Sequence, residues 1–249
     1  MEIVLPDESK KSGVRRLTVR CSSIGNYRIV DETAEPLFGK KAAIYQVVKS
    51  SALSAARFRL LEGKNDRRFT EAQWRTIDSL HRRFPDIVLR PEFNRICGEL
   101  VVEVCPWVKE TFEEWAVRKT RPVEKIIQAI REIVEKFDRL NNCGFFHRDS
   151  HGNNVMRCQK SGGWVIIDWD DLQVGNLKGN LFDSAVFLAF AVLILEEEFH
   201  WPLVQFLKEM RHSHPFNYKQ FKKRQDNAET ADFYRRRVAK ADAILSRYS

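Results

Sequence analysis

The chain has 249 residues, of which 43% are hydrophobic and 31% are charged, so it is long enough for one large domain or for two small lobes that share a core. This length and composition exclude a peptide, a repeat array and a low-complexity tail. Lys and Arg number 42 against 34 Asp and Glu, which gives a formal net charge of +8 and favours an anionic partner such as a nucleotide, a nucleic acid, an acidic protein surface or a membrane face.

The cysteines and the N-terminal residues predict a protein that stays inside a cell. The five cysteines form no C-x-x-C pair and lie among apolar neighbours, which indicates free thiols in a reducing compartment. The first residues lack the basic start and the apolar stretch of a secretory signal. The longest apolar run, Ala185–Leu195, is shorter than the roughly 20 residues that span a bilayer. We therefore expect a cytoplasmic location and no membrane span.

The first hundred residues are predicted to form mainly strands, because short segments rich in β-branched or aromatic residues alternate with polar turns. These segments are Ala42–Lys49, Ala56–Leu61, Asp86–Leu89 and Glu99–Val104. One helix interrupts them, from Thr70 to Arg82, with Thr70 in position to cap it.

Helical periodicity dominates after Pro106. Apolar residues make one stripe along Val123–Asn142, which predicts a long amphipathic helix that Gly144 closes in the left-handed conformation. A short strand, a loop and a hairpin follow, and the chain is predicted to return to helix from Asp183 to its end. A β-rich part, 1–104, and a helical part, 109–249, connected near 103–108, predict two lobes with a ligand cleft between them.

One stretch carries the chemistry. His147-Arg148-Asp149 is followed by Asn154, and an apolar strand after the hairpin ends in Asp168. This order of H-R-D-x-x-x-x-N and Asp, with a long amphipathic helix before it, resembles the protein-kinase-like phosphotransferases. The resemblance covers most of residues 37–195. It implies an α+β, two-lobed protein-kinase-like fold, with a β-rich N-lobe holding one helix and a mainly helical C-lobe.

The resemblance also implies roles for these residues. Asp149 would orient the acceptor hydroxyl and take its proton, while Asn154 and Asp168 would hold Mg²⁺ on the phosphates of ATP. Carboxylate and amide oxygens are the hard ligands that Mg²⁺ prefers. His147 and Arg148 would support the catalytic loop without taking part in the chemistry.

Two further segments agree with the family. Leu100–Trp107 resembles the strand and hinge against which adenine docks, with Glu103 and Cys105 offering backbone hydrogen bonds in the nucleotide-binding lobe. Asp183 resembles a buried aspartate that ties the following apolar helix to the catalytic loop. The alternative for Asp183 is a simple helix N-cap.

The nucleotide-binding lobe departs from the family pattern. Only Gly39 remains of the glycine-rich loop, and Arg59 stands in the position of the phosphate-binding lysine. The helix offers Gln73, or Glu71 close by, where a glutamate partner is expected. These changes allow a pseudokinase that acts as a binding module, or a minimal kinase in which Lys40 or Lys41 supplies the missing charge. We favour the minimal kinase, because the acidic residues that the family uses for phosphoryl transfer are all present in the helical part of this sequence.

The acceptor is less well indicated. His151, after the base, and the run that begins at Asp168 look like the aminoglycoside and choline kinases, whereas Arg148 looks more like protein kinases. Only 15 positions separate Asp168 from Asp183, so the long activation segment is absent, as in compact viral or pathogen effector kinases, which work in a host cell. We predict a Ser/Thr protein kinase, with a small-molecule kinase as the alternative. Basic segments near the C-terminus, such as Lys219–Arg224, could together dock an acidic protein, a lipid or RNA, although the overall basic charge does not imply nucleic acid.

Overall fold

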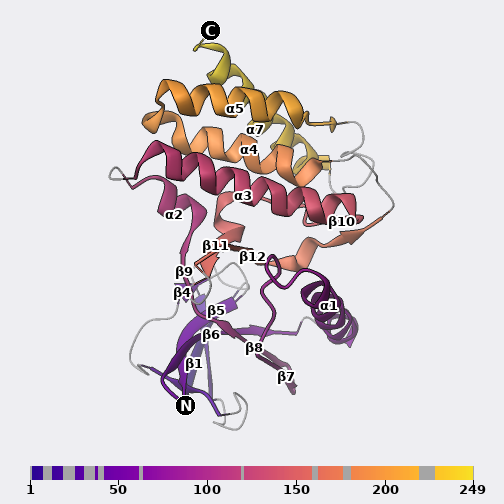
Figure 1. Cartoon of the computed structure of the whole chain (residues 1–249). Coiled ribbons are helices and arrows are strands. Elements are labelled where there is room, and N and C mark those ends of the chain that lie inside the picture. The colour runs from indigo at the N-terminus through magenta and orange to yellow at the C-terminus, as the bar shows by residue number, and fades with distance from the viewer. Residues whose placement is uncertain are drawn as a thin grey trace. The chain divides into compact units, whose positions relative to one another are not determined.

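The computed structural model describes residues 2–7, 13–18, 26–30, 37–38, 42–61, 64–118, 121–158, 162–175, 181–218 and 228–248. The chain divides into two compact units, the first made of 1–109 with 158–163 and the second of 110–157 with 164–249. It passes from the first unit to the second inside strand β9 (Val108–Thr111), and Figure 1 gives the labels of the elements.

The first unit is built on an antiparallel sheet of six strands. The strand order is β3-β5-β6-β8-β7, and β4 also pairs with β5. Two of the predicted strands lie at its centre, and they meet through a hairpin turn in which Ser50 and Ser51 both have positive φ. The strands are β3 (Arg28–Ile29), β4 (Leu37–Phe38), β5 (Ala42–Lys49), β6 (Ala52–Leu60), β7 (Phe93–Cys97) and β8 (Leu100–Pro106).

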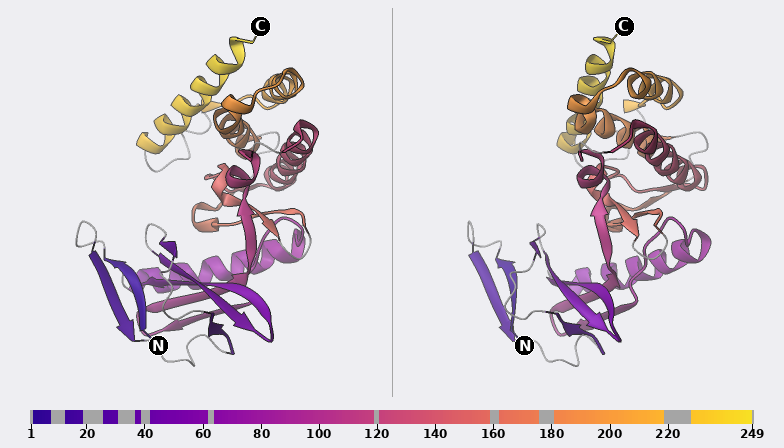
Figure 2. Two further views of the ribbon diagram at one scale, coloured as in Figure 1. Left: turned by 90° about the vertical axis from the view of Figure 1, so that its left-hand side faces the viewer. Right: turned by 60° about the vertical axis from the view of Figure 1, so that its left-hand side comes forward.

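One hydrophobic cluster of this unit lies on one face of the sheet. Alternate residues of β5, β6 and β8 are buried there, as the period of two of a strand requires, and Tyr45 and Phe58 meet edge to face with 5.6 Å between ring centroids. A separate hairpin, β1 (Glu2–Asp7) with β2 (Gly13–Thr18), contacts β5. Both views of Figure 2 show this hairpin and helix α1 (Lys64–Arg83) beside the sheet.

Two sequence predictions in this unit are wrong in detail. Helix α1 begins at Lys64, so Thr70 lies inside the helix and does not cap it, and its hydroxyl donates to the carbonyl of Asp66 at 2.8 Å. In place of the expected strand at Asp86–Leu89 there is a turn followed by a single bridge residue, Val88, because the amides of Ile87 and Val88 both bond to the carbonyl of Phe84 where α1 ends. Ile87 and Val88 are nevertheless fully buried. The apolar residues of this segment therefore predicted burial correctly, but they did not predict the type of secondary structure.

The second unit is mainly helical. Helix α3 has the predicted bounds, and it contacts α4 and α5, while α7 packs against α4. The helix expected from Asp183 to the end of the chain is divided into separate helices, with Pro202 in the first turn of α5. The helices are α2 (Phe112–Ala116), α3 (Val123–Asn142), α4 (Phe182–Leu195), α5 (Trp201–Ser213) and α7 (Ala228–Ser246).

Helix α4 is the centre of this unit. Its sequence is apolar on every side, and most of its residues are buried, as expected of a helix surrounded by others. Figure 1 shows α4 between α3 and α5, in agreement with their contacts. Phe187 of α4 packs against Phe112 of α2 and Phe137 of α3, with ring centroids 5.1 and 5.8 Å apart.

Short strands bring the loops of this unit together. The predicted hairpin is present as β11 (Val155–Cys158) and β12 (Trp164–Ile166), in a sheet of order β12-β11-β9. Strand β10 (Phe145–Phe146) pairs with β13 (Gln173–Val174). Both pairs flank the predicted catalytic loop, and they fix where it begins and ends.

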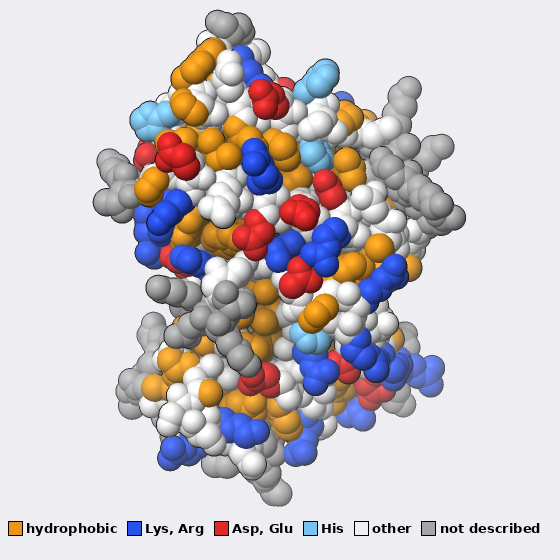
Figure 3. Space-filling model, in the orientation of Figure 1, with side chains coloured by type: hydrophobic (Ala, Val, Ile, Leu, Met, Phe, Trp, Pro, Cys, Tyr) orange, Lys and Arg blue, Asp and Glu red, His pale blue; other side chains and the backbone are white. Residues whose placement is uncertain are grey.

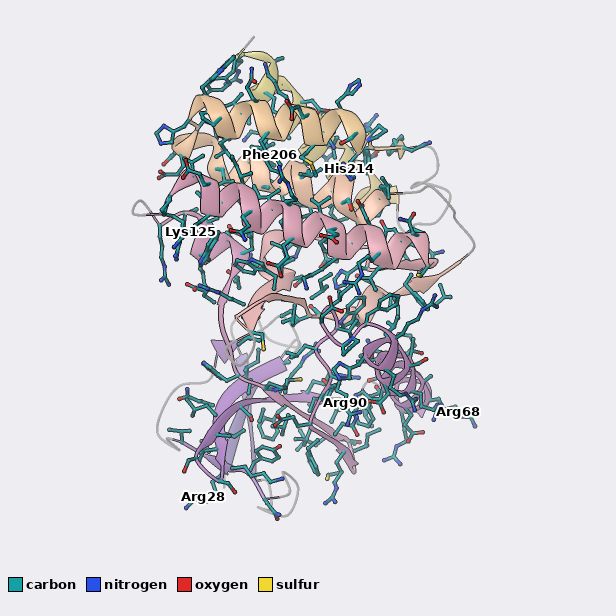
Figure 4. The ribbon with its side chains drawn as sticks, in the orientation of Figure 1. Arg28, Arg68, Arg90, Lys125, Phe206 and His214 are labelled. Carbon is teal, nitrogen blue, oxygen red and sulfur yellow. The ribbon has the colours of Figure 1, made fainter. Side chains whose placement is uncertain are left out.

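Several general predictions can be compared with the described residues. No described helix has both the length and the apolarity that a membrane span requires. Cys97, Cys105, Cys143 and Cys158 are free thiols, and Cys21 lies outside the described residues. Basic side chains gather over α1 in Figure 3, and Figure 4 shows Arg68 on the side of α1 away from the sheet. The basic segment Lys219–Arg224 lies outside the described residues.

Candidate active site

The catalytic loop starts from a glycine that no other residue could replace without strain. Gly144 has a φ of +80°, as predicted, and a Cβ added there would lie 2.3 Å from the carbonyl oxygen of Gly175. The amide of Gly175 in turn donates to the carbonyl of Gly144 at 2.8 Å. This close backbone contact, next to the β10–β13 pair, fixes the position from which the loop 147–151 departs.

Asp183 binds the loop from the other side. Its buried carboxylate accepts hydrogen bonds from the backbone amides of His147 and Arg148, at 2.8 and 2.9 Å, and from the side-chain amide of Asn141 at 2.6 Å. These bonds hold Arg148 in a left-handed conformation, with φ of 71°. The N-cap of α4 is Leu181, so the capping alternative for Asp183 is wrong, and the tie to the catalytic loop is the observed role.

His147 joins the loop to the strand that precedes Asp168. It is fully buried, its Nε2 lies 2.7 Å from the carbonyl oxygen of Ile167, and its ring contacts that of Trp169 at 4.8 Å. Its Nδ1 accepts from the amide of Asp149 at 3.4 Å. The side chain therefore joins the loop to the segment that holds Ile167 and Trp169.

The carboxylate of Asp149 is surrounded by hydrogen-bond donors. The side-chain amide of Asn154 donates to its Oδ2 at 2.9 Å, and Nε2 of His151 lies 3.4 Å from the same oxygen. The other oxygen, Oδ1, accepts from the hydroxyl of Tyr234 in α7 at 2.5 Å. The Asp149 side chain keeps 32% of its surface exposed, so a substrate can reach it.

These neighbours set the charge of the site. Burial raises the pKa of Asp149, but the hydrogen bonds from His151 and Tyr234 outweigh this effect and lower the pKa to about 2. Burial lowers the pKa of His151, yet the bond to Asp149 dominates, so that pKa is raised. The pKa of Tyr234 is raised, first by burial and then by the charge of Asp149. At neutral pH Asp149 is therefore a carboxylate and Tyr234 a neutral phenol.

The two predicted metal ligands meet through the β11–β12 hairpin. The amide of Ile167 donates to the carbonyl of Asn154 at 3.0 Å, which places Asp168 one residue beyond the partner of Asn154. Both hydrogen bonds that Asn154 makes to Asp149 use its Nδ2, so they do not occupy its amide oxygen. Asp168 is exposed, with φ of 60°, where the 3-10 helix η3 (Trp169–Asp171) begins.

This donor set fits Mg²⁺. One carboxylate and one amide oxygen are hard ligands, and Mg²⁺ in kinases completes its octahedron with waters and phosphate oxygens rather than with a full protein cage. Among the described residues, no three His, Cys, Asp or Glu side chains converge as a metal cluster. A metal ion held by Asn154 and Asp168 would therefore need further oxygen ligands.

In the first unit, Arg59 is held by a partner that the sequence did not indicate. Its guanidinium donates to Asp66 at 3.0 Å and to the hydroxyl of Thr70, both in α1. The expected partners, Gln73 and Glu71, lie further along the same helix. The error follows from the late predicted start of α1, which placed Asp66 outside the helix.

The other predicted nucleotide contacts divide into two groups. Strand β8 continues to Pro106, so Glu103 and Cys105 lie inside the sheet and pair with Arg57 and Ala55 of β6. This pairing turns their backbone toward β6 and argues against the predicted adenine contacts. The Glu103 side chain accepts from Trp74 of α1 and lies 3.6 Å from Arg57. Gly39, Lys40 and Lys41 lie outside the described residues.

Tyr234 is the member of the site that the sequence did not reveal. It is separated from Asp149 by 85 positions, and it stands in a basic run, Tyr234-Arg235-Arg236-Arg237, that reads as a solvated helix face. It is 4% exposed and packs on α4, so only the packing of two helices brings it to Asp149. Its aromatic character within a charged run was the one available signal.

The sheet order, the Asp183 tie and the loop geometry define a protein-kinase-like fold with the machinery of a phosphotransferase. Comparison with known families gives the same result: the profile of the phosphotransferase enzyme family, APH, matches residues 33–193, more than half of the chain. The chain belongs to this family. A comparison with curated proteins found no match.

Proposed function

We propose that the chain transfers the terminal phosphoryl group of Mg²⁺-bound ATP to a hydroxyl group of an acceptor. The observation that carries this proposal is the position of Asp149. Its carboxylate is ionised, partly exposed and oriented by Asn154, which is what a group needs in order to bind an acceptor hydroxyl and take its proton.

The neighbouring residues have distinct parts in the transfer. Asn154 and Asp168 would hold Mg²⁺, which neutralises charge on the phosphate oxygens when bound. Asp149 accepts the proton of the acceptor hydroxyl while the oxygen of that hydroxyl attacks the terminal phosphorus. Asp183 and His147 keep the loop in place, since they bind its backbone and its neighbouring strand. The phosphoryl group leaves ADP in the same displacement.

A small hydroxylated molecule is the acceptor that we place first. Tyr234 of α7 bonds to Asp149, and Phe190 of α4 lies against His151 with 5.8 Å between the rings. The ring of Phe233 in α7 contacts those of Phe190 and Tyr234. The C-terminal helices thus contribute to the surroundings of the base, which suits a bound small molecule. Membership in the phosphotransferase family is compatible with either acceptor.

A Ser or Thr side chain of a protein is the second candidate. The exposed third of the Asp149 side chain favours it, because an extended segment of another protein could then reach the base. Arg148 precedes Asp149, as an arginine does in protein kinases. This residue alone does not separate the protein acceptor from the small-molecule acceptor.

The first test measures turnover with γ-labelled ATP and Mg²⁺. We expect Asp149→Asn to lower phosphoryl transfer by about 10²–10⁴-fold, the range for loss of a general base, while nucleotide binding remains. Asp78→Asn is the matched control, since it also neutralises a carboxylate but at an exposed site in the first unit. Equal turnover in wild type and Asp149→Asn would remove the proposal.

The second test separates the acceptors. Wild type and Asp149→Asn are incubated with labelled ATP and either a panel of Ser- and Thr-containing proteins or a panel of small alcohols, sugars and amino alcohols. We expect Asp149-dependent label in the small-molecule panel. Label confined to the proteins would reverse the order of the two candidates.

A further inference from the structure

The hydroxyl of Tyr234 makes with Asp149 the kind of hydrogen bond that an acceptor hydroxyl makes with a general base. A general base takes a proton through a hydrogen bond from the group that it deprotonates. In the structure such a bond already exists, from Tyr234 to Oδ1 of Asp149. The donor belongs to the protein itself.

The second carboxylate oxygen offers no equivalent place. Oδ2 of Asp149 accepts from Asn154 and lies close to Nε2 of His151. Asn154 also donates to the backbone carbonyl of Asp149 at 2.8 Å, which fixes the side chain against rotation. Oδ2 therefore already has two protein partners, whereas the hydrogen bond to Oδ1 comes from the phenol of Tyr234.

The phenol is held on this oxygen by a well-packed helix. Tyr234 is 4% exposed and belongs to a buried cluster with Phe146, Phe182, Val186 and Ala231. Its ring meets that of Phe190 with 6.2 Å between centroids. The contact with the base therefore comes from the packing of α7 on α4, rather than from a side chain that moves freely in solvent.

We propose that Tyr234 selects the acceptor hydroxyl over water: its phenol occupies Oδ1 of Asp149 when no acceptor is bound, prevents water from using the base, and gives way to the acceptor hydroxyl. This proposal rests on the proposed function. A bound acceptor gains contacts that a water molecule lacks, so it can replace the phenol where water cannot.

The reaction that Tyr234 suppresses is the hydrolysis of ATP. In that reaction a water oxygen bonds to the terminal phosphorus, the bond from phosphorus to the bridging oxygen of ADP breaks, and Asp149 takes the water proton. The products are ADP and inorganic phosphate, and the proton passes from Asp149 to solvent. No further reactant is needed.

The experiment measures phosphate release from Mg²⁺·ATP with no acceptor added. We expect Tyr234→Phe to raise the rate about tenfold, which corresponds to about 1.4 kcal/mol, and we expect the rise to vanish in the double variant Tyr234→Phe with Asp149→Asn. Tyr218→Phe is the matched control, because its hydroxyl also donates to a carboxylate, that of Asp232 in α7, at 2.7 Å. It should leave the rate unchanged.

Thermal unfolding with and without Mg²⁺·ATP is recorded on the same samples. If ATP stabilises every variant and Tyr234→Phe hydrolyses ATP no faster than wild type, the proposal that Tyr234 excludes water from Asp149 is overturned, and the proposed function stands. An equal rise in Tyr218→Phe, or a rise that persists without Asp149, also overturns it. If ATP stabilises none of the proteins, the proposed function fails first.

Discussion

The hydrogen bonds of His214, in the second unit, depend on the protonation of its imidazole ring. Its Nε2 lies 3.1 Å from a carboxylate oxygen of Asp138, and its Nδ1 lies 2.9 Å from the carbonyl oxygen of Met210. Both partners are acceptors, so the doubly protonated imidazolium satisfies both bonds. The bond to Asp138 raises the pKa of His214 against the opposing effect of burial. Figure 4 shows His214 at the end of α5.

This raised pKa predicts a pH dependence of stability. A group whose pKa is higher in the folded state stabilises the fold fully below its unfolded value, here 6.5, and loses that contribution as pH rises through the folded value. We therefore expect the free energy of unfolding of wild type, relative to His214→Gln, to be larger at pH 6 than at pH 8.5. Urea denaturation of both proteins at the two pH values measures this difference.

The comparison with His214→Gln removes the contributions of other titrating groups. His212, an exposed histidine on the same helix, provides the control variant His212→Gln, which should keep the pH dependence of wild type. If wild type and His214→Gln change in parallel between the two pH values, the imidazolium does not stabilise the fold.

At the scale of elements, the catalytic loop depends on the backbone contact between Gly144 and Gly175. The contact joins the end of α3 to β13, and the pairing of β10 with β13 continues it. A side chain at position 144 would meet two penalties, the left-handed backbone and the collision with the carbonyl of Gly175. Both would move the segment that carries Asp149.

We expect Gly144→Ala to lower the free energy of unfolding by about 2–4 kcal/mol and to reduce phosphoryl transfer more than nucleotide binding. Gly98→Ala is the matched control: its φ of +64° imposes a similar backbone cost, but a Cβ there has no atom within 4 Å. Gly98→Ala should therefore cost only about 1 kcal/mol. Equal losses in the two variants, measured by urea denaturation, would show that the collision is relieved.

Elements with a strong local pattern could be predicted from the sequence. The apolar stripe along α3 predicted the bounds of that helix, and the alternation of apolar residues in β5 predicted that strand. Both predictions succeeded because each pattern follows directly from which residues are buried. The start of α1 was missed since Lys64–Phe69 is charged and has no apolar period. Contacts between distant helices leave no local pattern, so the sequence predicted Asp149 and not its partner Tyr234.

At the scale of the whole molecule, the nucleotide should bind the folded chain and not the unfolded one. Binding then stabilises the fold by mass action, by about 2.7 kcal/mol when the ligand is at 100 times its dissociation constant. Mg²⁺ held by Asn154 and Asp168 would contribute part of the free energy of nucleotide binding. The formal net charge of +8 also favours an anionic ligand over a neutral one.

We expect Mg²⁺·ATP to raise the thermal unfolding temperature of the chain, and EDTA to reverse most of this rise. Asn154→Ala and Asp168→Ala should lose the magnesium-dependent part, because each removes one oxygen ligand. Asp78→Ala, an exposed carboxylate in the first unit, serves as the control. An equal rise with ATP in EDTA and in Mg²⁺ would contradict a metal held by these two residues.

The buried helix α4 has a consequence for how the second unit opens. Helices α3, α5 and α7 all contact it, and its residues from Phe182 to Ala189 are buried. Its amide hydrogens should exchange with deuterated solvent only when the whole unit unfolds, whereas α7, with one exposed face, can open locally. Hydrogen exchange in α4 would therefore report the global stability of the unit, and exchange in α7 would report how often Tyr234 leaves Asp149.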